Sequence, residues 1–212
     1  MLREAALALS LLAAGSAVVP KLEPVGPLTE ASAPEAVRSA LEPRGERVLL
    51  PEGPWCEVWL RKGIPEQKTP TPGALRTDLG ISTAVGVIRF LTSATDFRGQ
   101  AIRPGFYTLR YAVIPDDGDH LGVSEYPDFL LVTRLADDPD PGARFKLEDL
   151  SSLSTKATGT RHPGVFALTR PSGEKSPSVT LNAAGHVVLQ VKARIGAAES
   201  AIALVVKGQA PQ

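Results

Sequence analysis

The chain has 212 residues, a length that suits one large domain or one domain with an appendage. Its 23 basic and 23 acidic residues cancel, so no net field attracts nucleic acid or anionic lipid. A single cysteine, Cys56, excludes an internal disulfide and any paired-cysteine metal motif. The 19 glycines and 19 prolines favour a turn-rich architecture over a helical one.

The first residues resemble a cleaved secretory signal. Arg3 gives a weakly positive start, residues 5–14 are apolar, and residues 15–17 are small, as at a cleavage site. The alternative is a short buried helix or a retained anchor, but the run falls short of the ~20 apolar residues that span a bilayer. We therefore expect residues 1–17 to be a signal peptide. The mature protein is then exported to the periplasm, the cell surface or the medium, with no transmembrane segment after cleavage.

Residues 18–45 are expected to form a linker followed by a short helix. The stretch 18–29 is rich in proline and has little periodicity. Ser32 is suited to cap a helix, Glu35 follows three residues later, and Gly45 is suited to end it.

From residue 46 to residue 208 the sequence predicts one all-β domain. Short runs rich in β-branched and aromatic residues are separated by Gly, Pro, Asn or Ser. The runs lie at 48–50, 55–61, 84–91, 106–114, 128–135, 164–170, 178–182, 186–193 and 201–207. About nine strands without long helices between them predict an antiparallel β-sandwich.

The spacing of the runs also predicts how they connect. In 106–114 and 186–193 apolar residues alternate with polar ones, as in an antiparallel sheet with one face in solvent. Short links join the last four strands and predict a meander. Two connections, 62–83 and 136–163, are long, and the second includes a segment suited to one or two helical turns.

The stretch "DFRGQAIRPGFYTLRYAVI", residues 96–114, carries a family resemblance. Pro104 and Gly105 set a turn before an alternating strand with Tyr107, Leu109 and Tyr111. The stretch resembles a hairpin of secreted bacterial β-sandwich modules, including prealbumin-like and carboxypeptidase-regulatory-like domains, and is similar to an uncharacterised family of exported bacterial proteins. The resemblance implies a fold and no catalytic residues.

The acidic loop 116–128 has a spacing that partly mimics a calcium-binding helix–loop–helix. Positions 1, 3, 6, 9 and 12 of that motif fall on Asp117, Asp119, Gly122, Glu125 and Asp128. Leu121 occupies position 5, where an oxygen ligand is needed, and the flanking segments are predicted strands. The alternatives are a looser calcium site or a solvated turn.

His120 and His162 both lie in loops that precede predicted strands, and imidazole pairs suit zinc or copper. A simple hairpin return would place them a strand length apart, whereas a crossover between sheets in 136–163 would reverse that order and allow them to lie at the same end. The candidate metal ligands are therefore Asp117, Asp119, His120, Asp128 and His162.

Trp55 and Trp59 are four residues apart in one predicted strand and so are expected to share a face. On an outer face such a pair would stack a sugar, and in the core it would only fill space. Cys56, on the face of Val58 and Leu60, is expected to be a buried structural thiol.

No catalytic residues can be assigned from the sequence. Ser124 lacks the second glycine of a nucleophile elbow, and no phosphate-binding loop or dinucleotide fingerprint is present. The leading hypothesis is an exported, non-enzymatic β-sandwich module that binds a protein or small ligand and needs no cofactor. The alternatives are a calcium, zinc or copper protein or metal-dependent enzyme built on 116–128 with His120, and a carbohydrate-binding module using Trp55 and Trp59.

Overall fold

The structure, a computed structural model, describes residues 19–115, 124–173 and 175–210. Its strands are β1 (Lys21–Val25), β2 (Gly45–Leu50), β3 (Gly53–Leu60), β4 (Ala84–Phe90), β5 (Ala94–Thr95), β6 (Ala101–Ile102), β7 (Gly105–Val113), β8 (Asp128–Arg134), β9 (Gly164–Thr169), β10 (Ser178–Leu181), β11 (Val187–Ile195) and β12 (Ala198–Lys207). The helices are α1 (Glu35–Ala40), a 3-10 turn (Leu135–Asp137) and α2 (Leu147–Thr158). The mostly antiparallel β class is confirmed, and each of the nine predicted runs overlaps a strand. Within the described residues no helix is both long and apolar enough to cross a membrane.

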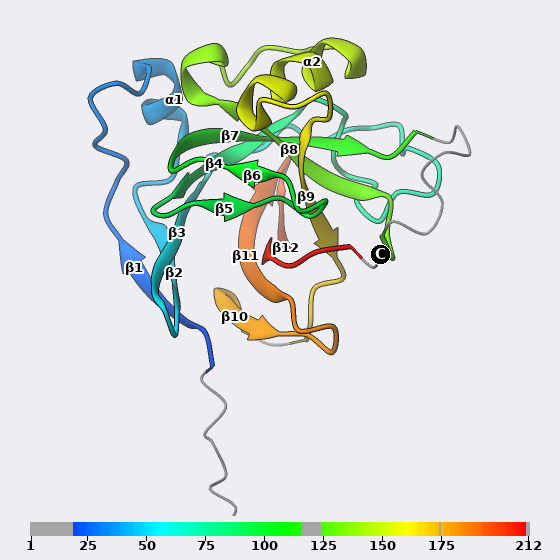
Figure 1. Ribbon diagram of the computed structural model, residues 1–212. Coiled ribbons are helices and arrows are strands. Elements are labelled where there is room, and N and C mark those ends of the chain that lie inside the picture. The colour runs from blue at the N-terminus through cyan, green and yellow to red at the C-terminus, as the bar shows by residue number, and fades with distance from the viewer. Residues whose placement is uncertain (1–18, 116–123, 174, 211–212) are drawn as a thin grey trace, which may run out of the picture.

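The two-sheet sandwich is not confirmed, because ten strands form one continuous sheet. Their order is β1-β2-β3-β4-β7-β8-β9-β12-β11-β10, while β5 and β6 form a separate hairpin. Neighbouring strands pair antiparallel throughout, and the end strands β1 and β10 approach each other. The sheet therefore curls into a nearly closed, barrel-like form (Figure 1). Extra residues at Trp55 in β3, Val85 in β4 and Val206 in β12 form bulges that help this closure, since a bulge increases local twist and bend.

The inner face of the curled sheet carries the main core. The alternation predicted for β7 is confirmed, because Tyr107, Leu109, Tyr111 and Val113 all belong to this core. Side chains that meet across the interior join strands that are far apart in the sheet. The rings of Phe90 in β4 and Phe166 in β9 stack at 5.4 Å between centroids.

β1 lies in the stretch that composition predicts to be a linker. It pairs with β2 over five residues, from Lys21 opposite Leu49 to Val25 opposite Gly45. Pro24 is tolerated there because β1 is an end strand of the sheet, where one side of the backbone needs no partner.

The meander predicted for the last four strands is wrong at its first step. β10, β11 and β12 follow one another, but β9 pairs with β12, with Leu168 opposite Leu204. Residues 170–177 connect β9 to β10, which lies on the far side of β11 instead. Eight residues reach up to ~26 Å, more than the ~14 Å of three strand spacings, so the link is long enough for this crossing.

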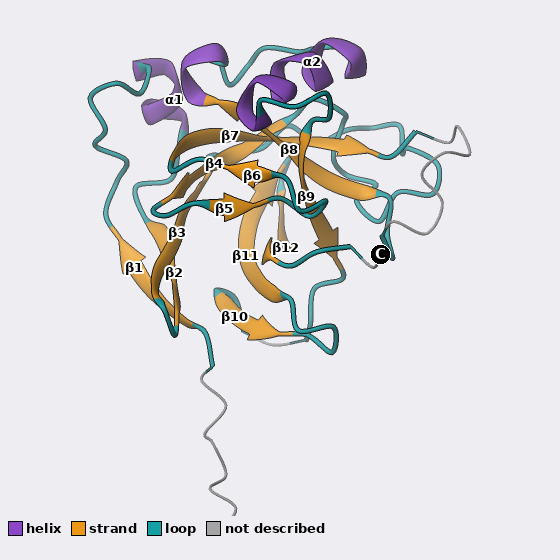
Figure 2. Ribbon diagram, viewed as in Figure 1, coloured by secondary structure: helices purple, strands orange, loops and turns teal. Residues whose placement is uncertain are grey.

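Two helices cover part of the outer face of the sheet, which therefore does not lie in solvent there. α1, which lies within the stretch expected to be helical, places Val37 on Trp59 and Val87. α2 places Leu150 on Ala112 and Leu131. Figure 2 shows both helices over the same end of the sheet. Thr108 and Arg110, on the face of β7 expected to be in solvent, are buried under the connection that leads to α2.

Candidate functional site

The outer face of β8 and β9 is apolar where it passes beneath α2. Phe129 and Leu131 of β8 and Val165 and Ala167 of β9 face outward, while the residues between them in sequence belong to the inner core. These four side chains line a pocket of about 440 Å³, named here the outer pocket. That volume is typical of sites for small molecules.

Two elements form walls of the outer pocket. α2 contributes Leu147 and Ser151, and the turn between β5 and β6 contributes Phe97 and Arg98. The backbone of Phe97 ties this turn to both neighbours, because its N–H donates to the Val165 carbonyl at 2.8 Å and its carbonyl accepts from Ala210 N–H at 2.8 Å.

Asp96 fixes the β5–β6 turn against β9. Its fully buried carboxylate accepts hydrogen bonds from four N–H groups. The donors are the backbone N–H groups of Arg98 (3.0 Å), Gln100 (2.7 Å) and Val165 (3.0 Å) and the side-chain amide of Gln100 (2.8 Å). With its charge compensated in this way, Asp96 sets the position of the pocket wall.

Arg98 and His162 are the basic side chains among the described residues that line the outer pocket. Both are exposed, and neither side chain forms a hydrogen bond or an ion pair with another described residue. Their segments are joined by Gln100, whose side-chain amide donates to the Pro163 carbonyl at 2.9 Å and whose side-chain oxygen accepts from Thr160. The two side chains are therefore on adjoining segments and free to meet a ligand.

Asp128, at the start of β8, also lines the pocket, but its carboxylate is occupied. It accepts from the backbone N–H groups of Leu75 (2.6 Å) and Arg76 (2.8 Å) and from the hydroxyl of Tyr111 (2.6 Å). Burial, followed by the hydrogen bond to Asp128, raises the pKa of Tyr111. Asp128 thus anchors the long 62–83 connection to the sheet.

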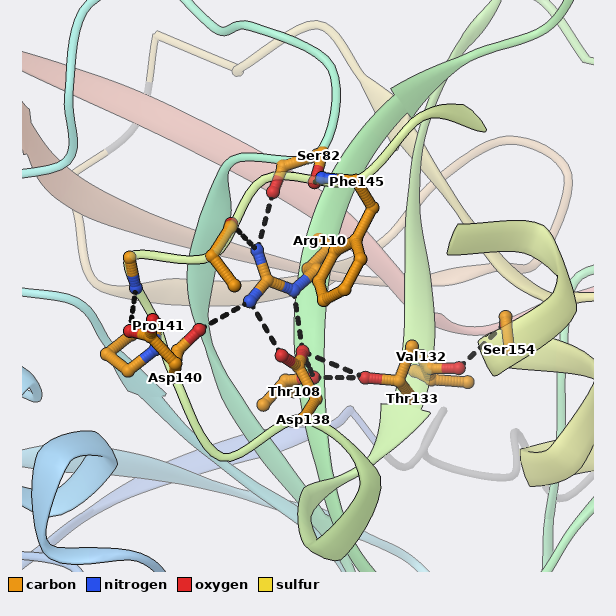
Figure 3. Close-up of polar contacts among 12 residues, drawn as sticks. Ser82, Thr108, Arg110, Val132, Thr133, Asp138, Asp140, Pro141, Phe145 and Ser154 are labelled. Atoms are coloured by element: carbon orange, nitrogen blue, oxygen red, sulfur yellow. Dashed lines mark hydrogen bonds and ion pairs between the residues drawn. The ribbon is translucent and has the colours of Figure 1, made fainter. Parts of the chain in front are cut away.

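A buried ion pair holds the segment that leads into α2. Arg110 of β7 donates from Nε and Nη2 to the Asp138 carboxylate, both at 2.6 Å, and both side chains are fully buried. Arg110 also donates to the carbonyls of Ser82 (2.7 Å) and Ala143 (2.9 Å), and its guanidinium lies over the Phe145 ring. Figure 3 shows this network, which fixes the approach to α2 and so the pocket wall.

α2 itself is fastened to both strands of the pocket floor through Ser154. Its buried hydroxyl donates to the Val132 carbonyl of β8 at 2.7 Å and accepts from the Gly164 N–H of β9 at 2.9 Å. Throughout the described residues, no buried side-chain nitrogen or oxygen lacks a hydrogen-bond partner.

The structure brings together only part of the predicted metal set. Asp117, Asp119 and His120 lie outside the described residues. Asp128 and His162 both line the outer pocket, but one begins β8 and the other precedes β9, toward opposite ends of that antiparallel pair. No group of three or more His, Cys, Asp or Glu side chains within the described ranges is placed to hold a metal ion. A metal site in this loop stays a prediction.

Trp55 and Trp59 do not share a face, so that expectation is wrong. Val48 pairs with Cys56 and Leu49 with Pro54, which leaves Trp55 as the extra residue of a β-bulge and turns it inward. Trp55 Nε1 donates to the Val206 carbonyl in the interior (3.0 Å), whereas Trp59 Nε1 donates to the Gly26 carbonyl on the outer side (2.8 Å). Both are buried in separate clusters, so the stacking surface that carbohydrate binding requires is absent at this pair.

Cys56 is buried in the inner core with Val58, as expected from the strand pattern. Burial raises the pKa of its thiol, so the reactive thiolate is disfavoured.

A second pocket, of about 560 Å³, lies near the gap between β1 and β10, and its charged groups already have partners. Lys207 pairs with Glu52 and lies over the Trp55 ring, 4.9 Å from its centroid. The His186 ring nitrogen is 3.1 Å from the Gln209 carbonyl oxygen. Its polar groups are therefore less available to a ligand than those of the outer pocket.

Comparison with protein-family models found no matching model, and comparisons with curated proteins and with solved structures found no significant match. The resemblance of residues 96–114 to secreted β-sandwich modules therefore stays a prediction.

Sequence reasoning missed the outer pocket, although one signal for it was present. The run Phe129-Leu130-Leu131-Val132 is apolar without alternation. Such a run is typical of a strand covered on both faces. The position of Arg98 in the pocket wall had no comparable signal, because it depends on the β5–β6 hairpin folding back onto β9.

Proposed function

We propose that the protein is a non-catalytic binding protein that holds a small, mainly apolar molecule in the outer pocket. The observation that carries the proposal is the apolar outer face of β8 and β9, lined by Phe129, Leu131, Val165 and Ala167. Apolar surface removed from water contributes about 25 cal/mol per Å², so such a floor favours an apolar ligand. The walls are fixed by Asp96 and Arg110 before any ligand arrives, and a preformed site loses less entropy on binding.

Binding is favoured over catalysis by how the pocket's polar groups are used. Ser124, His162 and Asp128 line the pocket and include the residue types of a hydrolytic triad. Asp128 is hydrogen-bonded to Leu75, Arg76 and Tyr111, and the His162 ring forms no hydrogen bond to a described residue. A triad requires the acid to orient the histidine and the histidine to contact the nucleophile. Asp128 and His162 are not arranged in this way, so the pocket is better suited to binding than to hydrolysis.

We also propose that the protein acts outside the cytoplasm, on the basis of the signal-like residues 1–17. Expression of the full chain in a bacterial host tests this. We expect the recovered protein to have lost its first residues near position 17, by mass spectrometry, and a full-length cytoplasmic product would contradict export.

Fluorescence of N-phenyl-1-naphthylamine, a neutral apolar dye, tests the binding function. We expect saturable binding of one dye per chain. Ser151→Trp should weaken it at least tenfold, because the indole would fill the space beside Leu147 and Phe129.

Ser152→Trp is the matched control. Ser152 is the next residue of α2, is exposed and does not line the outer pocket, so this variant should bind the dye as the unmodified protein does. Absence of saturable binding, or equal loss in both variants, would contradict the proposal.

A further inference from the structure

The outer pocket has an uneven distribution of charge. Among the described residues that line it, Arg98 is the permanently charged cation and Asp128 the carboxylate. Asp128 is buried and accepts three hydrogen bonds, whereas Arg98 is exposed and its guanidinium has no described partner. The positive charge is therefore available to a ligand and the negative charge is not.

Arg98 is held at a defined place although its side chain is free. Its backbone N–H donates to Asp96, and the adjoining Phe97 is bonded to Val165 of the pocket floor. The neighbouring carboxylate of Asp96 does not neutralise the guanidinium by contact, because its oxygens accept from four N–H groups instead. His162 lines the same pocket and adds a second side chain able to donate a hydrogen bond.

We infer that the ligand of the outer pocket is an amphiphile with an apolar body and a terminal carboxylate. Its apolar part would lie on Phe129, Leu131 and Val165, and its carboxylate would meet Arg98 and His162. Guanidinium groups present paired N–H donors that match the two oxygens of a carboxylate. A cationic ligand would be repelled by Arg98, and a neutral one would leave its donors unused. This inference rests on the proposed binding function.

Displacement of N-phenyl-1-naphthylamine by decanoate and by 1-decanol tests the inference, because the two competitors share a chain and differ in the head group. We expect decanoate to bind about tenfold more tightly than decanol, in keeping with a hydrogen-bonded charge pair. Arg98→Gln should remove this preference by weakening decanoate about tenfold relative to decanol, with both displacement constants calculated from the variant's own affinity for the dye.

Arg103→Gln is the control for net charge. Arg103 follows β6, is exposed and does not line the outer pocket, so its replacement should leave the preference for decanoate intact. Failure of the dye to bind would overturn the proposed function together with this inference. Dye binding with equal affinities for decanoate and decanol, or a preference that survives in Arg98→Gln, would overturn the inference alone.

Discussion

At the scale of single residues, the outer face of β7 shows how burial changes what a polar side chain does. Thr108 and Arg110 point away from the inner core, as their alternation predicts. They are nevertheless buried, because the segment around Asp138 folds over them and supplies a carboxylate. The alternation sets the direction of each side chain, but it carries no information on what later covers it.

Asp138→Asn tests the energetic role of the buried pair. The substitution keeps the shape of the side chain and removes its charge, which leaves the Arg110 guanidinium buried without a counter-ion. We expect the free energy of unfolding, measured with urea, to fall by about 3–5 kcal/mol. Glu35→Gln breaks the surface pair with Arg38 and should cost less than about 1 kcal/mol. Similar urea midpoints for Asp138→Asn and the unmodified protein would contradict this account.

At the scale of elements, the sequence predicted which segments are strands better than which strands are neighbours. Each strand carries its own signal of β-branched and aromatic residues, as in β7 and β11. The pairing of strands has no such local signal. β9 lies beside β12, and the eight-residue link 170–177 is long enough to lead past β11 to β10. A one-residue bulge likewise turned Trp55 inward and separated it from Trp59.

The candidate site, too, was predictable from the sequence only where one strand carries the signal by itself. The floor of the outer pocket could have been predicted from the unbroken apolar run in β8. Its walls could not, because they depend on α2 folding back over β8 and β9 and on the β5–β6 turn packing on β9, which is distant in sequence. Asp128, the last residue of the acidic loop predicted to bind metal, has a structural role, because its carboxylate anchors the 62–83 connection.

At the scale of the whole molecule, closure of the sheet places titratable groups inside a continuous core. Burial raises the pKa of Cys56 above the ordinary cysteine value of 9.0, and it raises the pKa of Tyr107 and Tyr111 above the ordinary tyrosine value of 10.0. The unfolded chain releases these protons at lower pH than the folded chain does. The stability that they contribute is therefore fully present below about pH 9 and is lost as the pH rises above it.

We expect the free energy of unfolding to fall by at least about 2 kcal/mol between pH 8 and pH 10.5, mainly through Cys56. Urea unfolding at the two pH values measures this. In the same samples at pH 8, a thiol reagent should react with Cys56 only after unfolding. A constant free energy of unfolding together with rapid labelling of the folded protein would contradict a closed core around this thiol.

The central claim is that the outer face of β8 and β9 holds a small apolar ligand, and an amide NMR titration with N-phenyl-1-naphthylamine tests it most directly. The account predicts saturable shifts confined to the pocket's elements, including the amides of Phe97, Phe129, Ser151 and Val165. Shifts that do not saturate, or that gather at the β1–β10 gap around His186 and Lys207, would contradict it.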